Sequence, residues 1–343
     1  MKPVIWETAS WETPKPVRPP SPWTALPPEA ASVLRPDVAL LVPTRNAGFL
    51  WRDWCEALRR QTVKPGWALV ADSESRDATP LIAARYGLQV TRVDARTFDH
   101  GLTRNRMAAM VPKAEILVYL TQDAVLADPQ ALERLLEPFA DPAVAIASGR
   151  QLPRPGAGEI EAQARLFNYP DQSRRIRKTD IPEMGIKAAF VSNSFCAWRA
   201  AALTAIGGFP STIMGEDTLA AARLLLSGAE IAYVAEARVY HSHAYSIREE
   251  SRRYFDIGVF HARFAAELEA FGRPEGEGRR FVRAQLEYLR KAAPGLIPGA
   301  ILRIGCKYAG YRLGRKEHFL PRFLKRRLSL HPGWWRKPYK VSA

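Results

Sequence analysis

The fold of this 343-residue chain is most restricted by a regular alternation of short apolar segments with amphipathic ones, which starts at Asp37. Strands are expected at 38–42, 67–71, 88–93 and 116–120. The first, second and fourth of these segments have the length and composition of strands buried on both faces. The segments between them have helical periodicity; they are the stretch with Phe49, Leu50, Trp54 and Leu58 on one face, residues 79–86 before Gly87, and residues 103–111. This order predicts right-handed βαβ crossovers and an open, mostly parallel α/β sheet flanked by helices.

The rest of the chain adds two parts to this core. Residues 1–36 are rich in proline and show neither period, which predicts a disordered lead-in. The core is expected over 37–255; its second half has a basic, loop-rich stretch at 150–187, a strand at 189–198, helices near 199–206 and 217–227, and a strand from 231 that leads through Tyr240 to His241. Residues 256–343 are expected to form a helical, basic C-terminal extension, interrupted at Pro294 and Pro298.

The positive charge of the chain is concentrated near its C-terminus. Residues 291–343 hold 13 lysines and arginines against the single acid Glu317, so they supply +12 of the formal net charge of +15. Apolar residues such as Ile301, Tyr308 and Trp335 are interspersed among these basic ones. A basic amphipathic helix with aromatics favours a peripheral position on an anionic membrane surface. The alternative is a helical subdomain that packs on the core and has a solvated basic face.

Cysteine usage and the first residues favour a cytoplasmic protein. Cys55, Cys196 and Cys306 are scattered, which indicates neither a disulfide framework nor a thiolate zinc site. Residues 1–36 lack the basic-then-apolar layout of a signal peptide, and no apolar run reaches the roughly 18 residues of a spanning helix. With the basic tail, this predicts a position on the inner face of the plasma membrane.

Polar residues follow the predicted strands at the edge where open α/β sheets bind ligands. After the first and second strands these residues are Pro43, Thr44, Arg45 and Asn46, and Asp72 and Ser73. The Asp72 carboxylate is placed to accept hydrogen bonds from a nucleobase or a ribose, and a turn residue is the alternative. Asp77, just before a helix, is more typical of a helix cap.

Gln122 and Asp123 follow the fourth predicted strand. A carboxylate at the mouth of a buried strand can bind Mg²⁺ or Mn²⁺ that also bridges two phosphates. A single aspartate can equally be a cap at the end of a strand, so the neighbouring segments decide between the two.

Together these segments resemble the family 2 glycosyltransferases of the GT-A fold. Residues 70–79 are similar to the family's nucleotide-binding V-D-x-S-x-D-x-T segment, with Glu74 where glycine is usual. Residues 122–124 are similar to its D-x-D segment, which binds metal and diphosphate, but lack the outer carboxylates. The resemblance implies a GT-A fold, a nucleotide-sugar donor at the strand ends, and a divalent metal, Mn²⁺ or Mg²⁺, at Asp123.

Two later segments extend this resemblance. Glu216-Asp217, at the start of a predicted helix, is similar to the family's E-D motif, which implies that Asp217 is the general base of an inverting transfer with Glu216 beside it. The alternative is a helix N-terminus with favourably placed acids. His241 and His243 point to the same side of an extended segment. In several members of this fold a histidine here completes the metal or diphosphate site, which implies His241, or else His243, as a ligand.

A narrower resemblance concerns donor and acceptor. Segments 97–105, 120–124, 149–153 and 253–258 are similar to bacterial rhamnosyltransferases of this family. Those enzymes use dTDP-L-rhamnose and build surface polysaccharides on a lipid diphosphate carrier. The similarity implies that the donor pocket is lined by Asp99, His100 and Arg104. Their alternative role is in a polar loop that caps the following helix.

Other functions are also compatible with the sequence. A hexosyl- or N-acetylhexosaminyltransferase that uses a UDP-sugar would share these motifs. The incomplete D-x-D segment also fits a non-catalytic protein that binds a nucleotide sugar. A nucleic-acid-binding protein would need phosphate-positioning and base-reading groups on one face, whereas the basic residues here lie beside apolar ones. We therefore expect no nucleic-acid partner.

Overall fold

The structure is a computed structural model that describes residues 32–272 and 275–336. Its first strand, β1, begins at Val33 and pairs with the second strand from that residue on. The last four residues of the expected lead-in, 33–36, therefore belong to the sheet. Residues 1–31 of that lead-in, with its three tryptophans, lie outside the described residues.

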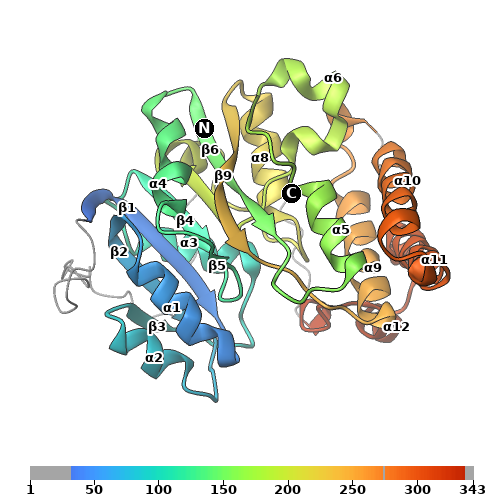
Figure 1. The fold of residues 1–343 in the computed structure, drawn as a ribbon, viewed down its shortest axis with the longest axis horizontal. Coiled ribbons are helices and arrows are strands. Elements are labelled where there is room, and N and C mark those ends of the chain that lie inside the picture. The colour runs from blue at the N-terminus through green and yellow to red at the C-terminus, as the bar shows by residue number, and fades with distance from the viewer. Residues whose placement is uncertain (1–31, 273–274, 337–343) are drawn as a thin grey trace.

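The N-terminal half of the sheet is parallel, as the alternation of strands and helices predicts (Figure 1). Its strands lie in the order β3, β2, β1 and β4, and each neighbouring pair is parallel. In chain order the elements are β1 (Val33–Thr44), α1 (Trp51–Arg59), β2 (Val63–Asp72), α2 (Thr79–Arg85), β3 (Gln89–Arg92), α3 (His100–Ala109) and β4 (Ile116–Leu120). Phe49 does not share the buried face of α1 and is 87% exposed, because a 3-10 turn precedes the helix.

The second half of the sheet is mixed, which differs from the mostly parallel sheet predicted. β8 lies between β4 and β6 and is antiparallel to both, whereas β9 is parallel to β6. Two short strands, β5 and β7, pair antiparallel with β9. The elements are β5 (Val125–Leu126), α4 (Ala131–Leu136), β6 (Val144–Leu152), α5 (Glu159–Asn168), β7 (Arg174–Ile176), α6 (Ile181–Met184), β8 (Phe195–Arg199), α7 (Ala200–Ala205), α8 (Glu216–Leu226) and β9 (Glu230–Tyr240).

Two predictions in this half need correction. The stretch at 150–187 contains α5, β7 and α6, whose mostly half-buried residues leave only a weak apolar period in the sequence. The strand predicted at 189–198 begins only at Phe195, because a 3-10 turn ends at Ala189 and the polar residues 192–194 form a loop. The helices predicted near 199–206 and 217–227 are confirmed as α7 and α8.

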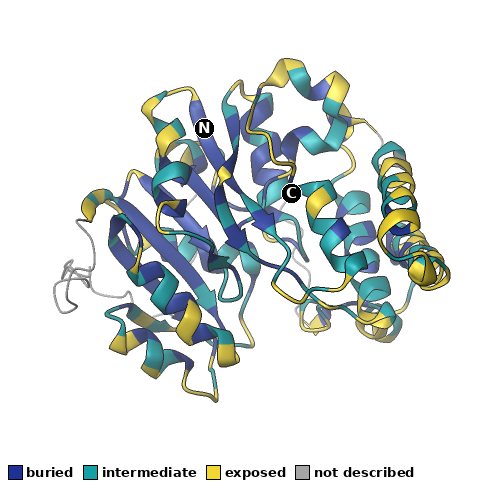
Figure 2. Cartoon of the chain, viewed as in Figure 1, coloured by how far each residue is buried: buried dark blue, intermediate teal, exposed yellow. Residues whose placement is uncertain are grey.

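Two apolar layers, one on each face of the sheet, form the core (Figure 2). Alternate residues of β1 divide between them, since Leu41 packs into one layer and Leu40 and Val42 into the other. β1, β2 and β4 are buried on both faces along their apolar runs, as predicted, whereas the edge strand β3 is only partly buried. Because both faces are covered, the carboxyl ends of the strands are the place left for a ligand.

Four helices follow β9 and lie on one side of the sheet (Figure 1): α9 (Ile247–Arg263), α10 (Glu275–Ala292), α11 (Ile297–Arg315) and α12 (Arg322–Leu328). α11 packs so closely along α9 that a Cβ added at Gly314 would lie only 2.0 Å from the carbonyl oxygen of Phe255. Pro294 lies in the 3-10 turn before α11 and Pro298 in its first turn, where proline is tolerated. The boundary expected between 255 and 256 falls inside the continuous helix α9.

α11 turns two basic residues toward α9 and several apolar residues toward the solvent. Arg303 and Lys307 pair with Glu250 of α9 at 2.9 and 3.0 Å. Ile301 and Tyr308 of the same helix are 54% and 58% exposed. The tail therefore packs on the core and also presents an apolar surface. Within the described ranges, none of the helices combines the length and apolar character needed to cross a bilayer.

Candidate active site

The loops after β1, β2 and β4 are joined at one edge of the sheet by side-chain hydrogen bonds. The Gln122 side chain accepts a hydrogen bond from the Arg45 backbone N–H at 2.7 Å and donates one to the Arg45 carbonyl at 3.1 Å. Thr44 Oγ1 donates to the Asp72 carboxylate at 3.2 Å. The structure therefore brings together residues 43–46, Asp72 and Gln122, which the sequence predicts to hold a nucleotide.

Asp72 organises the loop after β2. Its buried carboxylate accepts hydrogen bonds from the Ser75 backbone N–H at 2.9 Å and from Ser75 Oγ at 2.6 Å. Asn46, whose backbone is left-handed with φ of 47°, donates its N–H to Ser75 Oγ at 2.7 Å. Ser73 Oγ is buried without a hydrogen-bond partner in the described part of the chain, so this loop has a polar group left for a ligand.

Asp123, His241 and His243 form a cluster beside these loops. Asp123 lies in the turn after β4, and the two histidines lie in the segment after β9. His241 Nε2 is 3.4 Å and His243 Nε2 is 3.7 Å from Asp123 Oδ2, and one ligand atom of each residue lies within 4.8 Å of the others. Both histidines, which the sequence left as alternatives, therefore face one carboxylate oxygen with a spacing that fits a single divalent cation.

The hydrogen bonds of His241 determine which of its nitrogens carries the proton. His241 Nδ1 lies 2.8 Å from Gln151 Oε1, which also accepts a hydrogen bond from Arg165 Nη1 at 2.6 Å. Because an amide oxygen only accepts, Nδ1 carries the proton and Nε2 presents a lone pair to Asp123. A lone pair and a carboxylate oxygen at 3.4 Å repel each other unless a cation lies between them. This arrangement, with a glutamine behind the ligand, fits a metal site.

Burial keeps both histidines in the neutral form that a metal requires. It lowers the pKa of His241 below its ordinary value. It also lowers the pKa of His243 to about 3, with a smaller contribution from His241. The two imidazoles therefore offer lone pairs at neutral pH.

Asp217 is a further carboxylate at this edge. It follows Gly215, whose φ of 79° favours glycine, in the first turn of α8. Its oxygens accept hydrogen bonds from the backbone N–H groups of Asn193 at 3.0 Å and Thr218 at 2.8 Å. Burial, helped by the charge of Glu216, raises the pKa of Asp217 to about 6. A carboxylate with a raised pKa that is still ionised at neutral pH is suited to accept a proton.

The loop before β8 places Asp217 near the cluster. Asn193 donates its backbone N–H to Asp217, and the carbonyl of the next residue, Ser194, accepts a hydrogen bond from the Thr121 N–H at 3.3 Å. Thr121 lies two residues before Asp123 in the turn after β4. The predicted base and the predicted metal ligand thus meet at one edge, although they are almost a hundred residues apart in the chain.

Glu216 and Arg104 form a buried ion pair with each other. Arg104 Nη1 lies 2.6 Å from Glu216 Oε1, and the two side chains are 5% and 7% exposed. The pair joins α3 to the first turn of α8 and so positions Asp217. Arg104, predicted to line the donor pocket, therefore has a partner within the protein.

Asp99 caps α3, which is the alternative role considered for it. It accepts hydrogen bonds from the Leu102 N–H at 3.0 Å and from Ser211 Oγ at 2.7 Å. The ring of the next residue, His100, packs edge to face against His331, with ring centroids 5.4 Å apart. The C-terminal tail therefore reaches the predicted donor segment, residues 97–105. No motif in the sequence indicated His331.

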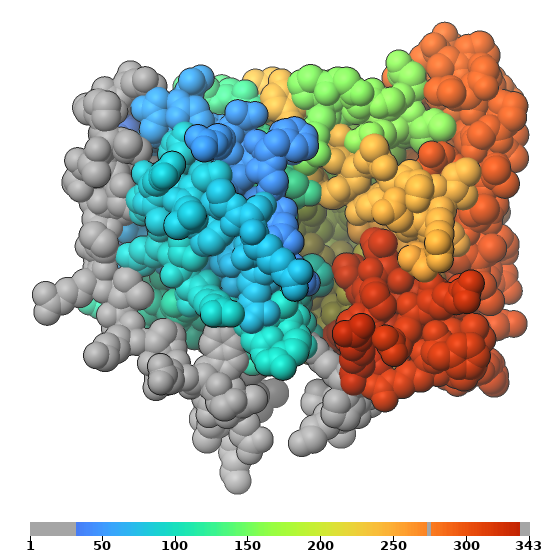
Figure 3. Space-filling model, turned by 90° about the horizontal axis from the view of Figure 1, so that it is seen from below, coloured from blue at the N-terminus to red at the C-terminus, as the bar shows by residue number. Residues whose placement is uncertain are grey.

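The space around this edge is visible as a recess (Figure 3). β1 points toward this face, and the recess separates the blue and cyan N-terminal residues from the red C-terminal tail.

Two arginines near the Asp123–His241–His243 cluster had no role assigned from the sequence. Arg154 donates to the Asp123 carbonyl at 2.6 Å, and Arg253 is close enough to His243 to help lower its pKa. Such cations suit a diphosphate.

The sequence motifs did not single out four residues near this site: Gln151, Arg154, Arg165 and Arg253. Gln151 and Arg253 lie in segments similar to rhamnosyltransferases, and that similarity was the available signal. Arg154 and Arg165 lie in a generally basic stretch, where charge alone did not single out a position.

Comparison with protein families agrees with this geometry. The model of a family described as "Glycosyltransferase like family 2" matches residues 36–256, which is more than half of the chain. The chain belongs to glycosyltransferase family 2. It is a glycosyltransferase, and its mixed α/β sheet with flanking helices is the GT-A architecture that the sequence motifs predict.

The transferase is also similar to two curated bacterial proteins over most of its length. It is 42% identical over 300 residues to the O-antigen chain rhamnosyltransferase RfbN of Salmonella typhimurium, which covers 87% of this chain and 96% of the relative. It is 42% identical over 302 residues to the O-antigen chain rhamnosyltransferase WbaN of Salmonella anatum, with 88% and 96% covered.

Two solved structures are more distantly similar to the transferase. The mannosyltransferase PcManGT from Pyrobaculum calidifontis, in complex with GDP-Man and Mn²⁺, is 19% identical with a TM-score of 0.49, and 89% of each chain is covered. TarS 1–349 of S. aureus, in complex with UDP-GlcNAc, is 14% identical with a TM-score of 0.49, with 82% of this chain and 91% of that one covered.

Proposed function

We propose that this protein is an inverting rhamnosyltransferase that moves L-rhamnose from dTDP-L-rhamnose onto a glycan carried by a lipid diphosphate, in the synthesis of a surface polysaccharide. The names of two relatives at 42% identity support the sugar and the product class. The observation that carries the proposal is the placement of Asp217 at the same edge as the Asp123–His241–His243 cluster.

In this proposal Asp217 takes the proton of the acceptor hydroxyl while that oxygen attacks the anomeric carbon of the donor. Each of its oxygens accepts one backbone hydrogen bond and keeps a lone pair for the hydroxyl. The Arg104–Glu216 pair holds the helix turn that carries this base. A carboxylate on the side of the sugar opposite the leaving group gives inversion.

The donor diphosphate lies against the Asp123–His241–His243 cluster in this proposal. Two neutral imidazoles and one carboxylate suit Mn²⁺ better than Mg²⁺, which prefers oxygen ligands. A bound Mn²⁺ would neutralise charge on the departing nucleoside diphosphate. Arg154 and Arg253 add positive charge at the same place, and Asp72 and Ser73 hold the nucleoside.

We also propose that the C-terminal helices hold the enzyme at the inner face of the plasma membrane, where a lipid-linked acceptor is presented. Outward apolar side chains of the tail support this, since Ile301, Leu302 and Phe319 are 54%, 57% and 75% exposed. The basic residues that pair with acids fasten the tail to the core, and others, such as Arg327, are exposed. Apolar and cationic groups on one segment favour an anionic bilayer.

A donor comparison tests the proposed reaction. The purified protein is incubated with acceptor and with dTDP-L-rhamnose, UDP-glucose or UDP-N-acetylglucosamine, each with Mn²⁺ or with EDTA. We expect transfer from dTDP-L-rhamnose, inversion at the anomeric carbon, and loss of transfer in EDTA. Preferential use of a UDP-sugar would replace rhamnose as the donor sugar. Donor binding without any turnover would show a non-catalytic protein, and full activity in EDTA would contradict the metal.

A further inference from the structure

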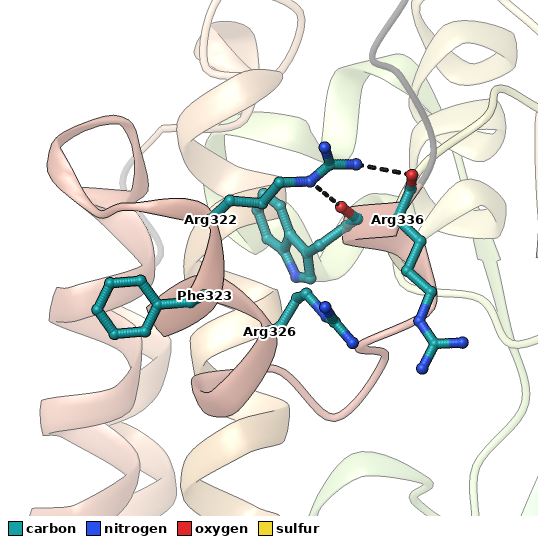
Figure 4. A pocket seen from close by; sticks show the side chains of 5 residues that line it. Arg322, Phe323, Arg326 and Arg336 are labelled. Carbon is teal, nitrogen blue, oxygen red and sulfur yellow. Dashed lines mark hydrogen bonds between the residues drawn. The ribbon is translucent and has the colours of Figure 1, made fainter.

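The C-terminal tail contains a pocket that the proposed transfer reaction does not use (Figure 4). The pocket has a volume of about 420 Å³ and is lined by Arg322, Phe323, Arg326, Trp335 and Arg336. Three of these five residues are arginines and none is acidic. They come from α12 and from the turn at residues 334–336, beyond the stretch that matches the family model.

The pocket is held in shape by contacts of its own residues. The Arg322 guanidinium donates hydrogen bonds to the carbonyl oxygens of Trp335 and Arg336, at 2.5 and 2.6 Å. Trp335 is only 5% exposed and packs against Phe255 of α9. Because these groups are already ordered, a ligand does not have to order them on binding.

The unsatisfied groups of the pocket are all hydrogen-bond donors. In the ranges that the structure describes, the guanidinium groups of Arg326 and Arg336 have no carboxylate partner, and Trp335 Nε1 is buried without an acceptor. Nearby Arg263 differs, because it pairs with Glu317 at 2.7 Å. Cations held together without acids repel one another unless an anion compensates them. A ligand that only accepts hydrogen bonds and carries negative charge meets all of these requirements.

We infer that this pocket binds the phosphate group of an anionic phospholipid at the membrane surface. Guanidinium groups match the paired oxygens of a phosphate, which a single ammonium group does not. Phe323 is 68% exposed and points away from the arginines on the outer side of α12 (Figure 4), where it reaches toward the acyl chains. The inference rests on the proposed membrane attachment and adds to it a defined site for one lipid headgroup.

A pair of double variants with equal charge tests the site. Arg326→Gln/Arg336→Gln removes the two unpaired guanidinium groups but keeps Arg322, which supports the backbone. Arg279→Gln/Arg290→Gln, at exposed positions of α10, removes the same charge elsewhere. Flotation is measured with vesicles of phosphatidylcholine alone or mixed with phosphatidylglycerol. We expect the pocket variant to bind the anionic vesicles about 25-fold more weakly, on the order of fivefold for each arginine, and the control to lose less than that.

Each other outcome would overturn the assignment. Equal losses in the two double variants would show that only overall charge matters. Unchanged vesicle binding by the pocket variant, together with lost binding of soluble glycerol 3-phosphate in calorimetry, would assign the pocket to a free phosphate compound. Transfer of rhamnose to a soluble acceptor is measured in parallel and should be unchanged in both variants. A failed transfer assay with intact lipid selectivity would therefore refute the proposed reaction and not the lipid site.

Discussion

At the scale of single residues, Asp217 is the group on which the proposed chemistry depends most directly. Asp217→Asn keeps the size of the side chain and one accepting oxygen but removes the base, so we expect kcat to fall by about 10²–10⁴. Donor affinity, measured by calorimetry, should stay near that of the wild type. The wild-type rate should fall as the pH drops through about 6. Asp217, whose pKa is raised to about 6, becomes protonated there and can no longer accept a proton.

Glu216→Gln tests the separate, structural role of the neighbouring carboxylate. It changes the adjacent carboxylate and leaves Arg104 buried without its charge partner. Breaking a buried ion pair costs about 3–5 kcal/mol, so this variant should melt at a clearly lower temperature. A correctly folded Asp217→Asn enzyme with wild-type kcat would show that another group is the base.

Gln151 is expected to act on the metal site through His241. Gln151→Leu removes the oxygen that holds the proton on His241 Nδ1, so the ring loses its orientation toward Asp123. We expect the affinity for Mn²⁺, titrated without any sugar present, to fall by roughly 10–100-fold. His318→Ala, at an exposed histidine of the tail, should leave that affinity unchanged. Equal Mn²⁺ affinities of Gln151→Leu and wild type would exclude this role of Gln151.

At the scale of elements, the contact between α9 and α11 gives segment 253–258 a structural meaning. A Cβ at Gly258 would lie 2.3 Å from the Tyr311 carbonyl oxygen, so this position admits only glycine while the helices stay in contact. Gly314 of α11 is restricted in the same way, because a Cβ there would lie 2.0 Å from the Phe255 carbonyl oxygen of α9. Segment 253–258, one of those that resemble rhamnosyltransferases, is therefore where α11 of the tail contacts α9.

Two glycine substitutions in α11 should have opposite effects on stability. Gly314→Ala forces the two helices apart and should lower the free energy of unfolding by about 1–3 kcal/mol. Gly299→Ala has nothing within 4 Å of the added Cβ and should raise it by roughly 0.5–1 kcal/mol, because alanine favours a helix more than glycine does. Urea denaturation measures both. A neutral Gly314→Ala would mean that α11 is not held against α9 in solution.

At the scale of the whole molecule, Asp256 connects the end of the tail to the core. Its Oδ2 accepts hydrogen bonds from the backbone N–H groups of Leu330 and His331, at 2.9 and 3.2 Å, and its Oδ1 is buried without a partner among the described residues. Burial raises the pKa of Asp256 to about 7. The same contact places His331 against His100 of the donor loop.

The attachment of the tail should weaken as the pH rises. A carboxyl group whose folded pKa is raised contributes stability that is fully present below its unfolded pKa, near 4, and is lost as the pH rises through about 7. His331 does not titrate in this window, because burial lowers its pKa to about 3. Hydrogen exchange at residues 329–336 should therefore be faster relative to the core at pH 8 than at pH 6. Asp256→Asn should remove that difference, and the same difference in the variant would contradict the assignment.

Much of the fold was determined by the sequence itself. Val38–Val42 and Ile116–Leu120 have to be buried on both faces wherever they lie, and the helices between them impose parallel pairing. The polar residues that follow, from Thr44 to Asp123, must then gather at one edge. The site was therefore predictable as far as it is built from strand ends in this parallel half.

The tertiary structure decided the parts that depend on contacts between distant segments. Only folding shows that His241 and His243 both face Asp123, and that Arg104 is paired with Glu216. The antiparallel insertion of β8 and the docking of the tail through Asp256 likewise have no local period to reveal them. Periodicity reports which face of an element is buried, whereas the partner of a polar side chain is set by the position of a second chain segment, which no local pattern specifies.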